Sequence, residues 1–186
     1  RGGQVYLSPF QGLVDAFLMD NGLPITDSNS GYDAKKPYEN REARFYYTIL
    51  YQGSKWIPKN GSTTPEEISF IFGEAPDGLG KGSTKTGYAS RKFCDESVDG
   101  GQGGGDQVLP FIRLGEIYLN YVEAMNEYNP SNKAEIESYL IKLRKRAGIK
   151  PGADNRYGLP ATYTQDQMRT IIHNERRVEL SLEEGH

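Results

Sequence analysis

Cysteine, histidine and tryptophan are scarce in this sequence. Its 186 residues include one cysteine, two histidines and one tryptophan. A single cysteine excludes an internal disulfide, although it does not indicate a cellular compartment. The 22 lysines and arginines against 25 aspartates and glutamates leave a net charge of −3 and no basic field that would attract nucleic acid. No apolar run approaches the ~18 residues that a membrane-spanning helix needs.

The sequence contains histidine, cysteine and glutamate, which are common catalytic and metal-binding residues. They do not have the spacing that such sites require. His173 falls in a predicted helix among polar residues, and His186 is the last residue. No two histidines have the spacing of metal ligands. Cys94 stands in no pattern typical of a catalytic thiol. Glu183 and Glu184 are adjacent and would point to different faces of a helix. We therefore predict no catalytic residues, no metal site and no cofactor.

Two polar loops resemble ligand-binding motifs only superficially. Residues 27–33 carry acidic and amide side chains, but an EF-hand loop needs glycine at its sixth position and glutamate at its twelfth. Here Gly31 is fifth and Tyr38 is twelfth, so we predict a solvated turn. In residues 80–84, Gly82 separates the lysine from the serine and threonine that must follow it directly in a phosphate loop. We predict that this segment belongs to a long irregular loop.

Aromatic residues are abundant, with 13 tyrosines and 7 phenylalanines, and several fall in one predicted helix that begins near Phe111. On a helical wheel this helix has a single narrow polar strip. The strip contains Arg113, Glu116, Asn120, Glu123 and Glu127. Because almost every other position is apolar, aromatic or small, we predict a central helix with neighbours on both sides in an all-helical stack.

Capping patterns predict two further helices. Asn132, with a glutamate three residues later, starts a helix that ends before Gly148, so the two helices would form an antiparallel hairpin. Thr164 and Gln167 form a second capping box, which opens a last helix through Glu184. The apolar residues expected in the core of this last helix are Met168, Ile171, Ile172, Val178 and Leu182.

In the first half of the chain, the sequence predicts one helix and two short strands. Ser8 and Pro9 suit the start of a helix that buries Phe10, Leu13, Val14 and Phe17. Residues 44–52 are rich in aromatic and β-branched residues, which predicts a strand. Residues 67–72 form a second apolar run, which predicts a strand or an extended segment.

The charged residues of the predicted helices allow two interpretations. The polar strip of the central helix could bind a ligand, or it could pair across helices with Arg144, Arg146, Arg176 or Glu179. We favour the pairing, because polar groups between stacked helices need partners. The sequence ERRVE in residues 175–179 is expected to form structural ion pairs for the same reason.

Several segments resemble motifs of the SusD/RagB family, the surface glycan-binding lipoproteins of Bacteroidetes-type nutrient uptake systems. Residues 113–124 resemble the family's RLxEvyLnyAEA helix, with Val122 where alanine is usual. Residues 143–148 look like its iRxRAG helix end. Residues 175–185 are similar to its ERrxElafEG segment. Residues 13–22 and 40–46 match its lvdaf…dG and nRDpRf blocks, with Glu42-Ala43 in place of Asp-Pro.

The resemblance implies a mainly α-helical SusD-like fold, associated with tetratricopeptide-like helices, with long irregular loops and a few short strands. It implies that residues 1–186 are the C-terminal part of a longer SusD-like domain. An N-terminal helical-repeat region, a signal peptide and a lipid-attachment cysteine are then expected upstream.

The function implied by the resemblance is non-catalytic. The protein would bind oligosaccharides at the surface of the outer membrane, held there by a lipid anchor, and deliver them to a SusC-like TonB-dependent transporter. Two alternatives remain: a helical-repeat adaptor that binds protein, and a glycoside hydrolase, which would need a pair of carboxylates flanking a cleft.

Aromatic residues outside the predicted helices are the candidates for sugar contact, because sugar rings stack their C–H faces on aromatic rings. They are Trp56, Tyr6, Tyr32, Tyr38, Tyr88 and Tyr157. Trp56 is the first choice as the one tryptophan, placed beyond a predicted turn, and Tyr32, Tyr38 and Tyr88 follow it. The resemblance assigns none of these residues, because the family's glycan contacts lie in variable loops.

Overall fold

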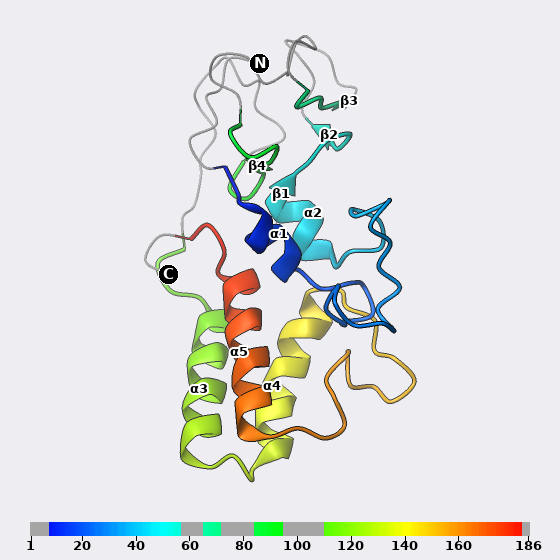
Figure 1. Cartoon of the computed structure of the whole chain (residues 1–186). Helices are drawn as coiled ribbons and strands as arrows, with labels where there is room; N and C mark the ends of the chain where they lie inside the picture. Colours follow the sequence, from blue (N-terminus) through cyan, green and yellow to red (C-terminus); the bar gives the residue numbers. More distant parts are fainter. Residues whose placement is uncertain (1–7, 57–64, 72–83, 95–109, 184–186) are drawn as a thin grey trace. The chain divides into compact units, whose positions relative to one another are not determined.

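The computed structural model describes residues 8–56, 65–71, 84–94 and 110–183 (Figure 1). The chain divides into two compact units. The strand unit comprises Arg1–Val14 and Tyr47–Leu109, and the helical unit comprises Asp15–Tyr46 and Pro110–His186. The regular secondary structure of the described residues is mostly helical with a few two-residue strands, as predicted from the resemblance.

Three helices form the body of the helical unit: α3 (Leu114–Tyr128), α4 (Lys133–Arg146) and α5 (Gln165–Glu179). α3 packs against both α4 and α5, which confirms its two predicted neighbours, and α3 and α4 form the predicted hairpin (Figure 1). The core between the helices is apolar. It contains Val122, Ile136, Leu140, Leu159, Tyr163, Met168 and Ile172.

Two helix ends, the start of α5 and the end of α4, form as the sequence predicts. The Thr164 backbone N–H donates to Gln167 Oε1 at 2.8 Å, and the Gln167 N–H donates to Thr164 Oγ1 at 3.2 Å, which is the predicted capping box. After α4, Gly148 has a φ of 76°. The N–H of Ile149 reaches the Arg144 carbonyl and the N–H of Gly148 reaches that of Lys145, so a Schellman motif ends the helix.

Two boundary predictions are wrong. Asn132 is the N-cap of α4, but its side chain donates to the Glu135 carboxylate at 2.6 Å and makes no cap hydrogen bond, so the predicted capping box does not form. α5 ends at Glu179 and does not reach residue 184, because the chain turns at Leu182 with a φ of 62°. Of the core predicted for α5, Met168, Ile172 and Val178 are fully buried.

The strand unit contains two small antiparallel pairs. β1 (Ile49–Leu50) pairs with β4 (Ala89–Ser90), and β2 (Lys55–Trp56) pairs with β3 (Glu66–Glu67). Its apolar cluster consists of Leu50, Ile68, Phe70 and Ala89, with Trp56 packed against it. Ile68 and Phe70 alternate with the half-buried Ser69, as expected for the extended segment predicted at 67–72. Residue 72 lies outside the described residues.

The strand predicted for residues 44–52 is wrong over most of its length. Ala43–Thr48 forms the helix α2, and only Ile49–Leu50 is a strand. Burial explains the difference: Phe45, Thr48 and Ile49 are buried at helical spacing, whereas Tyr47 is exposed. Phe45 also packs edge-on against Phe17, with ring centres 5.7 Å apart. These contacts outweigh the β propensity of the aromatic residues.

The first helix begins later than predicted. α1 spans Gln11–Ala16, so Ser8 and Pro9 precede it. Leu13, Val14 and Phe17 are buried as expected, but Phe10 is 58% exposed and does not join the apolar core.

Candidate functional site

Trp56, the first choice for ligand contact, lies in β2 and not in a loop. It is half-buried and packs against the apolar cluster of the strand unit. The pairing with β3 places Glu66 opposite Trp56 and Glu67 opposite Lys55. Trp56 therefore supports the strand unit as well as presenting part of its ring at the surface.

An arginine lies against Trp56 and against a second aromatic ring. The guanidinium carbon of Arg91 is 5.4 Å from the centre of the Trp56 ring and 5.5 Å from that of the Tyr47 ring. Both distances are within the range of a cation–π contact. We call Tyr47, Trp56 and Arg91 the aromatic clamp. Arg91 directly follows β4, and its backbone N–H donates to the Thr48 carbonyl at 2.8 Å, which fixes its position beside α2.

The clamp combines surfaces that suit a ligand with both apolar and hydroxyl faces. Tyr47 is 68% exposed. Aromatic rings offer flat apolar faces, and a guanidinium offers N–H donors in one plane. Sequence analysis missed Tyr47 because it fell in a predicted strand. Reading residues 45–49 at helical spacing, with Phe45 and Ile49 inward, would have placed Tyr47 outward.

The other three candidates for sugar contact are tyrosines in both units of the chain. Tyr88 belongs to the strand unit, is buried, and donates its hydroxyl to Gln11 Oε1 at 2.8 Å. Tyr32 and Tyr38 belong to the helical unit and are half-buried. The ring of Tyr38 stacks on Phe45 with centres 6.1 Å apart. A buried ring leaves little surface for a sugar, which argues against Tyr88, whereas Tyr32 and Tyr38 are half-buried as Trp56 is.

Two further aromatic candidates for sugar contact remain, Tyr6 and Tyr157. Tyr6 lies outside the described residues. Tyr157 is half-buried in the helical unit, where its carbonyl accepts a hydrogen bond from Arg144 at 2.8 Å.

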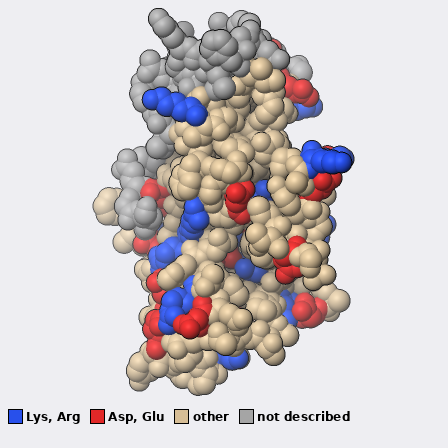
Figure 2. Space-filling model, in the orientation of Figure 1, with Lys and Arg blue, Asp and Glu red and all other residues tan. Residues whose placement is uncertain are grey.

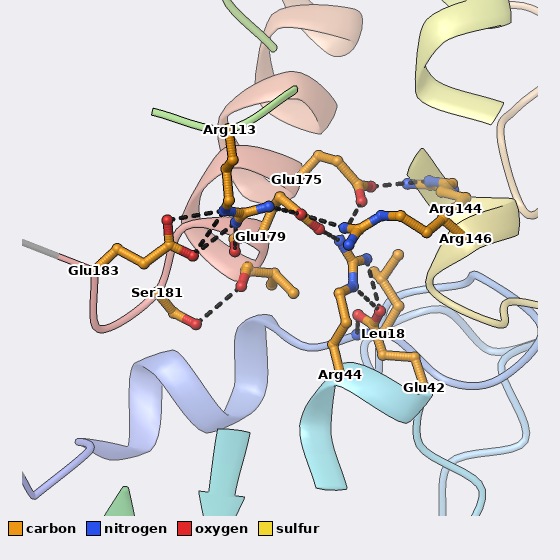
Figure 3. Close-up of polar contacts among 11 residues, drawn as sticks. Leu18, Glu42, Arg44, Arg113, Arg144, Arg146, Glu175, Glu179, Ser181 and Glu183 are labelled. Carbon is orange, nitrogen blue, oxygen red and sulfur yellow. Dashed lines mark hydrogen bonds and ion pairs between the residues drawn. The ribbon is translucent and has the colours of Figure 1, made fainter. Parts of the chain in front are cut away.

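The interior of the helical unit contains a second polar cluster, an ion-pair network centred on Arg44 (Figure 3). Arg44 Nη2 lies 2.6 Å from Glu42 Oε2, and its Nη1 lies 2.7 Å from Glu175 Oε1 and 2.9 Å from Glu179 Oε2. Arg144 Nε also contacts Glu175 Oε2, at 2.9 Å. Arg44 thus connects three buried carboxylates, one just before α2 and two in α5.

The network extends to the end of α5. Arg113 donates to the Glu179 and Glu183 carboxylates, the latter at 2.7–3.0 Å, and Arg146 also pairs with Glu179. Burial alone would raise the pKa of Glu179, but Arg44, Arg113 and Arg146 outweigh it and lower the pKa to about 2.

The pKa values of Glu175 and Glu42, which both pair with Arg44, are shifted in opposite directions. Burial also acts to raise the pKa of Glu175, yet Arg44 and Arg144 lower it. For Glu42 burial prevails and raises the pKa, with Glu175 adding to the effect and Arg44 opposing it.

The polar strip of α3 pairs across helices, as predicted. Arg176 contacts Glu123 at 2.9 Å and Asn120 at 2.6 Å, both from α5 to α3. Glu127 pairs with Arg169 at 2.7 Å, a partner that the sequence analysis had not named. These groups serve helix packing, so the strip is occupied by protein partners.

The described residues contain no group of three or more histidine, cysteine, aspartate or glutamate side chains placed to hold a metal ion. In the acidic loop, Asp27 accepts the Asn29 N–H at 2.8 Å and Asp33 accepts the Lys35 N–H at 2.9 Å, so both carboxylates form local turns. On the face in Figure 2, acidic and basic side chains are interspersed. None of the helices in the described part has the length and apolar character to cross a membrane.

Comparison with known proteins identifies the family to which the chain belongs. The model of the SusD family matches residues 1–186. The chain belongs to the SusD family.

Individual SusD-like relatives agree with this result. The chain is 32% identical over 152 residues to SusD-like protein P2 of Formosa agariphila, a match that covers 80% of this chain and 28% of that protein. Among solved structures, a SusD-like protein of Bacteroides fragilis is similar with a TM-score of 0.73 at 28% identity, over 95% of this chain and 34% of that one.

A second solved structure is a SusD-like carbohydrate-binding protein of Bacteroides fragilis. It matches with a TM-score of 0.74 at 25% identity, over 98% of this chain and 34% of that one. The chain thus spans about a third of the length of the SusD-like proteins that it matches.

Four of the five segments that resemble SusD-family motifs contribute side chains to the ion-pair network. Glu42 and Arg44 come from the block at 40–46, Arg113 from the start of the α3 motif, and Arg144 and Arg146 from the end of α4. Glu175, Glu179 and Glu183 come from the last block. The motifs therefore mark the residues that join the helices, whereas the aromatic clamp lies outside all of them.

Proposed function

We propose that this SusD-family protein binds oligosaccharides without cleaving them. The main support is the match over 98% of the chain to a SusD-like carbohydrate-binding protein. Trp56 is our leading sugar-contact residue, because its half-buried ring is fixed by packing and has an arginine beside it. A ring held in place by the core loses little conformational freedom when a ligand binds.

We further propose that the ligand is passed to a SusC-like TonB-dependent transporter at the outer membrane, where a lipid anchor attached upstream of this sequence holds the protein. This part of the proposal rests on the family alone. Co-purification of the full-length protein with a TonB-dependent transporter, and its release from cells by lipase treatment or loss of the anchor cysteine, test the two statements separately.

The proposed binding is tested with a glycan array probed by the full-length protein, followed by affinity electrophoresis on the glycans that bind. Binding without release of new reducing ends supports a non-catalytic binding protein. Release of reducing ends would instead favour a glycoside hydrolase.

One apolar face of α3 is exposed in the described residues. Leu114, Ile117, Tyr121, Ala124 and Tyr128 recur every three or four residues along it. α4 and α5 pack against other faces of the same helix. We propose that tetratricopeptide-like helices of a longer SusD-like domain, of which these residues are the C-terminal part, cover this face. The length of the matched relatives supports this arrangement.

The isolated 186 residues should then melt over a broad temperature range, because α3 lacks a partner for its apolar face. Circular dichroism and light scattering measure this directly. A sharp, cooperative melt of a monomer would show that these residues form a complete domain.

The same apolar face also favours the second candidate function, a helical adaptor for protein, since amphipathic helices dock on such faces. That reading predicts no glycan affinity and capture of a defined protein or peptide by the full-length chain.

A further inference from the structure

Two loops of the helical unit cross in backbone contact beside the buried side chain of Arg144. The first loop spans residues 18–24, and the second spans residues 149–163, between α4 and α5. We infer that Arg144 is a latch that holds the two loops together and makes the order of the second loop depend on the ion-pair network inside the helices. This latch is independent of the glycan binding proposed above.

The crossing is formed by two glycines, Gly22 and Gly158, whose φ angles are 81° and 76°. A β-carbon at Gly158 would lie 2.6 Å from the Cα of Gly22, and one at Gly22 would lie 2.8 Å from the carbonyl carbon of Tyr157. Both distances are too short for a real β-carbon, so glycine at each position lets the two backbones approach.

The residue before the second glycine is also in an unfavourable conformation. Tyr157 has a φ of 55°, in the left-handed region that bulky side chains rarely adopt. Such a conformation persists only where the surrounding contacts hold it in place. The second loop therefore needs an interaction that fixes its backbone at this point.

Arg144 supplies this interaction from the end of α4, where its side chain is buried. Its Nη1 donates to the Tyr157 carbonyl at 2.8 Å and to the Gly22 carbonyl at 3.3 Å. Its Nε donates to Glu175 Oε2 at 2.9 Å (Figure 3). One guanidinium thus joins a carbonyl of each loop to a carboxylate of α5. Hydrogen bonds from a charged donor are strong, and burial removes competing water.

The latch is continuous with the ion-pair network. Glu175 also lies 2.7 Å from Arg44 Nη1, so its carboxylate is held from both sides and restricts the orientation of the Arg144 side chain. Arg144 is therefore a positioning residue that connects the network to the loops.

A second tie between the loops lies nearer the surface. The Lys150 N–H donates to the Asp20 carbonyl at 2.7 Å, and the two side chains pair at 2.6 Å. The Lys150 side chain is 67% exposed, and exposed ion pairs contribute little to stability. We therefore assign the main hold on the crossing to Arg144.

Hydrogen–deuterium exchange of the full-length protein measures the opening of each loop separately from the helices. Arg144→Lys keeps a cation beside Glu175, but its single nitrogen cannot occupy the positions of both Nε and Nη1. Peptides covering residues 18–24 and 149–163 should exchange about tenfold faster or more, as expected for loss of charge-assisted hydrogen bonds. Peptides from α3 should keep their exchange rate.

Arg146→Lys is the matched control. Arg146 lies two residues later in the same helix, and among the described residues its side chain pairs with Glu179 and with no carbonyl of either loop. Exchange in both loops should be the same in Arg146→Lys as in the unaltered protein.

Gly158→Ala tests the crossing without changing any charge. It should speed the exchange of both loops about tenfold or more, because the added methyl group forces the two backbones apart. Gly31→Ala is its control: Gly31 has a similar φ of 75°, but a β-carbon there would meet no atom within 4 Å. It introduces the same backbone strain without the contact, so exchange in the two loops should change less than about threefold.

Unchanged loop exchange in a folded Arg144→Lys variant, or equal exchange in Arg144→Lys and Arg146→Lys, overturns the latch. If Arg144→Lys unfolds, seen as fast exchange throughout the helices, the two glycine variants decide. Faster exchange of the loops in Gly158→Ala than in Gly31→Ala supports the crossing, and equal exchange in these two variants overturns it.

Discussion

The helical unit and the strand unit differ in what their polar side chains do. In the helical unit, arginines and glutamates from distant segments pair with one another in the interior. In the strand unit, the arginine of the aromatic clamp lies against aromatic rings near the surface. The first arrangement joins helices, and the second presents a mixed apolar and hydrogen-bonding surface. Four of the five segments that resemble family motifs contribute to the first arrangement.

This contrast separates family recognition from ligand recognition. Motif residues such as Arg113 and Glu175 are half-buried or buried, and their charged groups are already paired with protein partners. Tyr47 and Arg91 lie in no motif. Under the proposed function, we therefore expect residues outside the family motifs to contact the glycan.

The largest expected effect comes from removing the central cation of the network. Arg44→Ala would leave Glu42 and Glu175 as buried carboxylates without their shared partner, which costs about 3–5 kcal/mol of unfolding free energy. Urea denaturation of the full-length protein measures this loss of unfolding free energy. Arg169→Ala is the control, because its pair with Glu127 is at the surface, and it should change stability little. Equal losses from the two variants would show that the network does not stabilise the fold.

Acid should destabilise the helical unit through the same network. The pKa of Glu179 is lowered to about 2, below its unfolded value of about 4.3. The stability from the ionised group is therefore present above about pH 5 and is lost as the pH falls toward 2, at a cost of roughly 3 kcal/mol. The raised pKa of Glu42 has the opposite sign, so its contribution is present at low pH and is lost as the pH rises. Midpoints of urea unfolding, measured between pH 2 and 6, report the sum of the contributions of Glu179 and Glu42 to stability.

Glu179→Gln removes the titrating group but keeps a side chain of similar size. The variant should be less stable than the unaltered protein at pH 6, and its stability should fall less steeply with acid. A slope unchanged by the substitution would mean that Glu179 does not carry the acid sensitivity.

The sequence predicted the helical unit better than the strand unit, and the reason is physical. The Thr164–Gln167 capping box and the Gly148 helix end depend on residues three or four positions apart, so local spacing reveals them. Arg44 meets Glu179 across 135 positions, so no local pattern could show that Arg44 is the centre of the network. Residues 43–48 became a helix because Phe45 is buried by contacts with distant residues, and the position of Tyr47 could not be predicted without them.

A smaller effect should distinguish the two rings of the clamp. Trp56→Ala removes a ring packed against the apolar cluster of the strand unit, so it should cost about 1–2 kcal/mol of stability for the half-buried side chain as well as glycan affinity. Tyr47→Ala should lose affinity with a stability change within about 0.5 kcal/mol, as is usual for exposed positions. Thermal melts and titration of both variants separate the two roles. A large stability loss in Tyr47→Ala would show that this ring also supports the fold.

The smallest expected effect is that of pH on glycan binding near neutrality. A neutral sugar brings no titrating group, and the aromatic clamp consists of a tyrosine, a tryptophan and an arginine, none of which ordinarily changes charge between about pH 6 and 8. Histidine is the side chain that ordinarily titrates in this range. The one histidine among the described residues, His173, belongs to the helical unit, where its ring lies 3.3 Å from Glu123. Affinity for a neutral oligosaccharide that binds on the glycan array, measured by isothermal titration at pH 6, 7 and 8 at constant ionic strength, should therefore vary by less than about twofold. A change of tenfold or more across this range would require a titrating group in the binding site and would exclude the clamp, on its own, as the site.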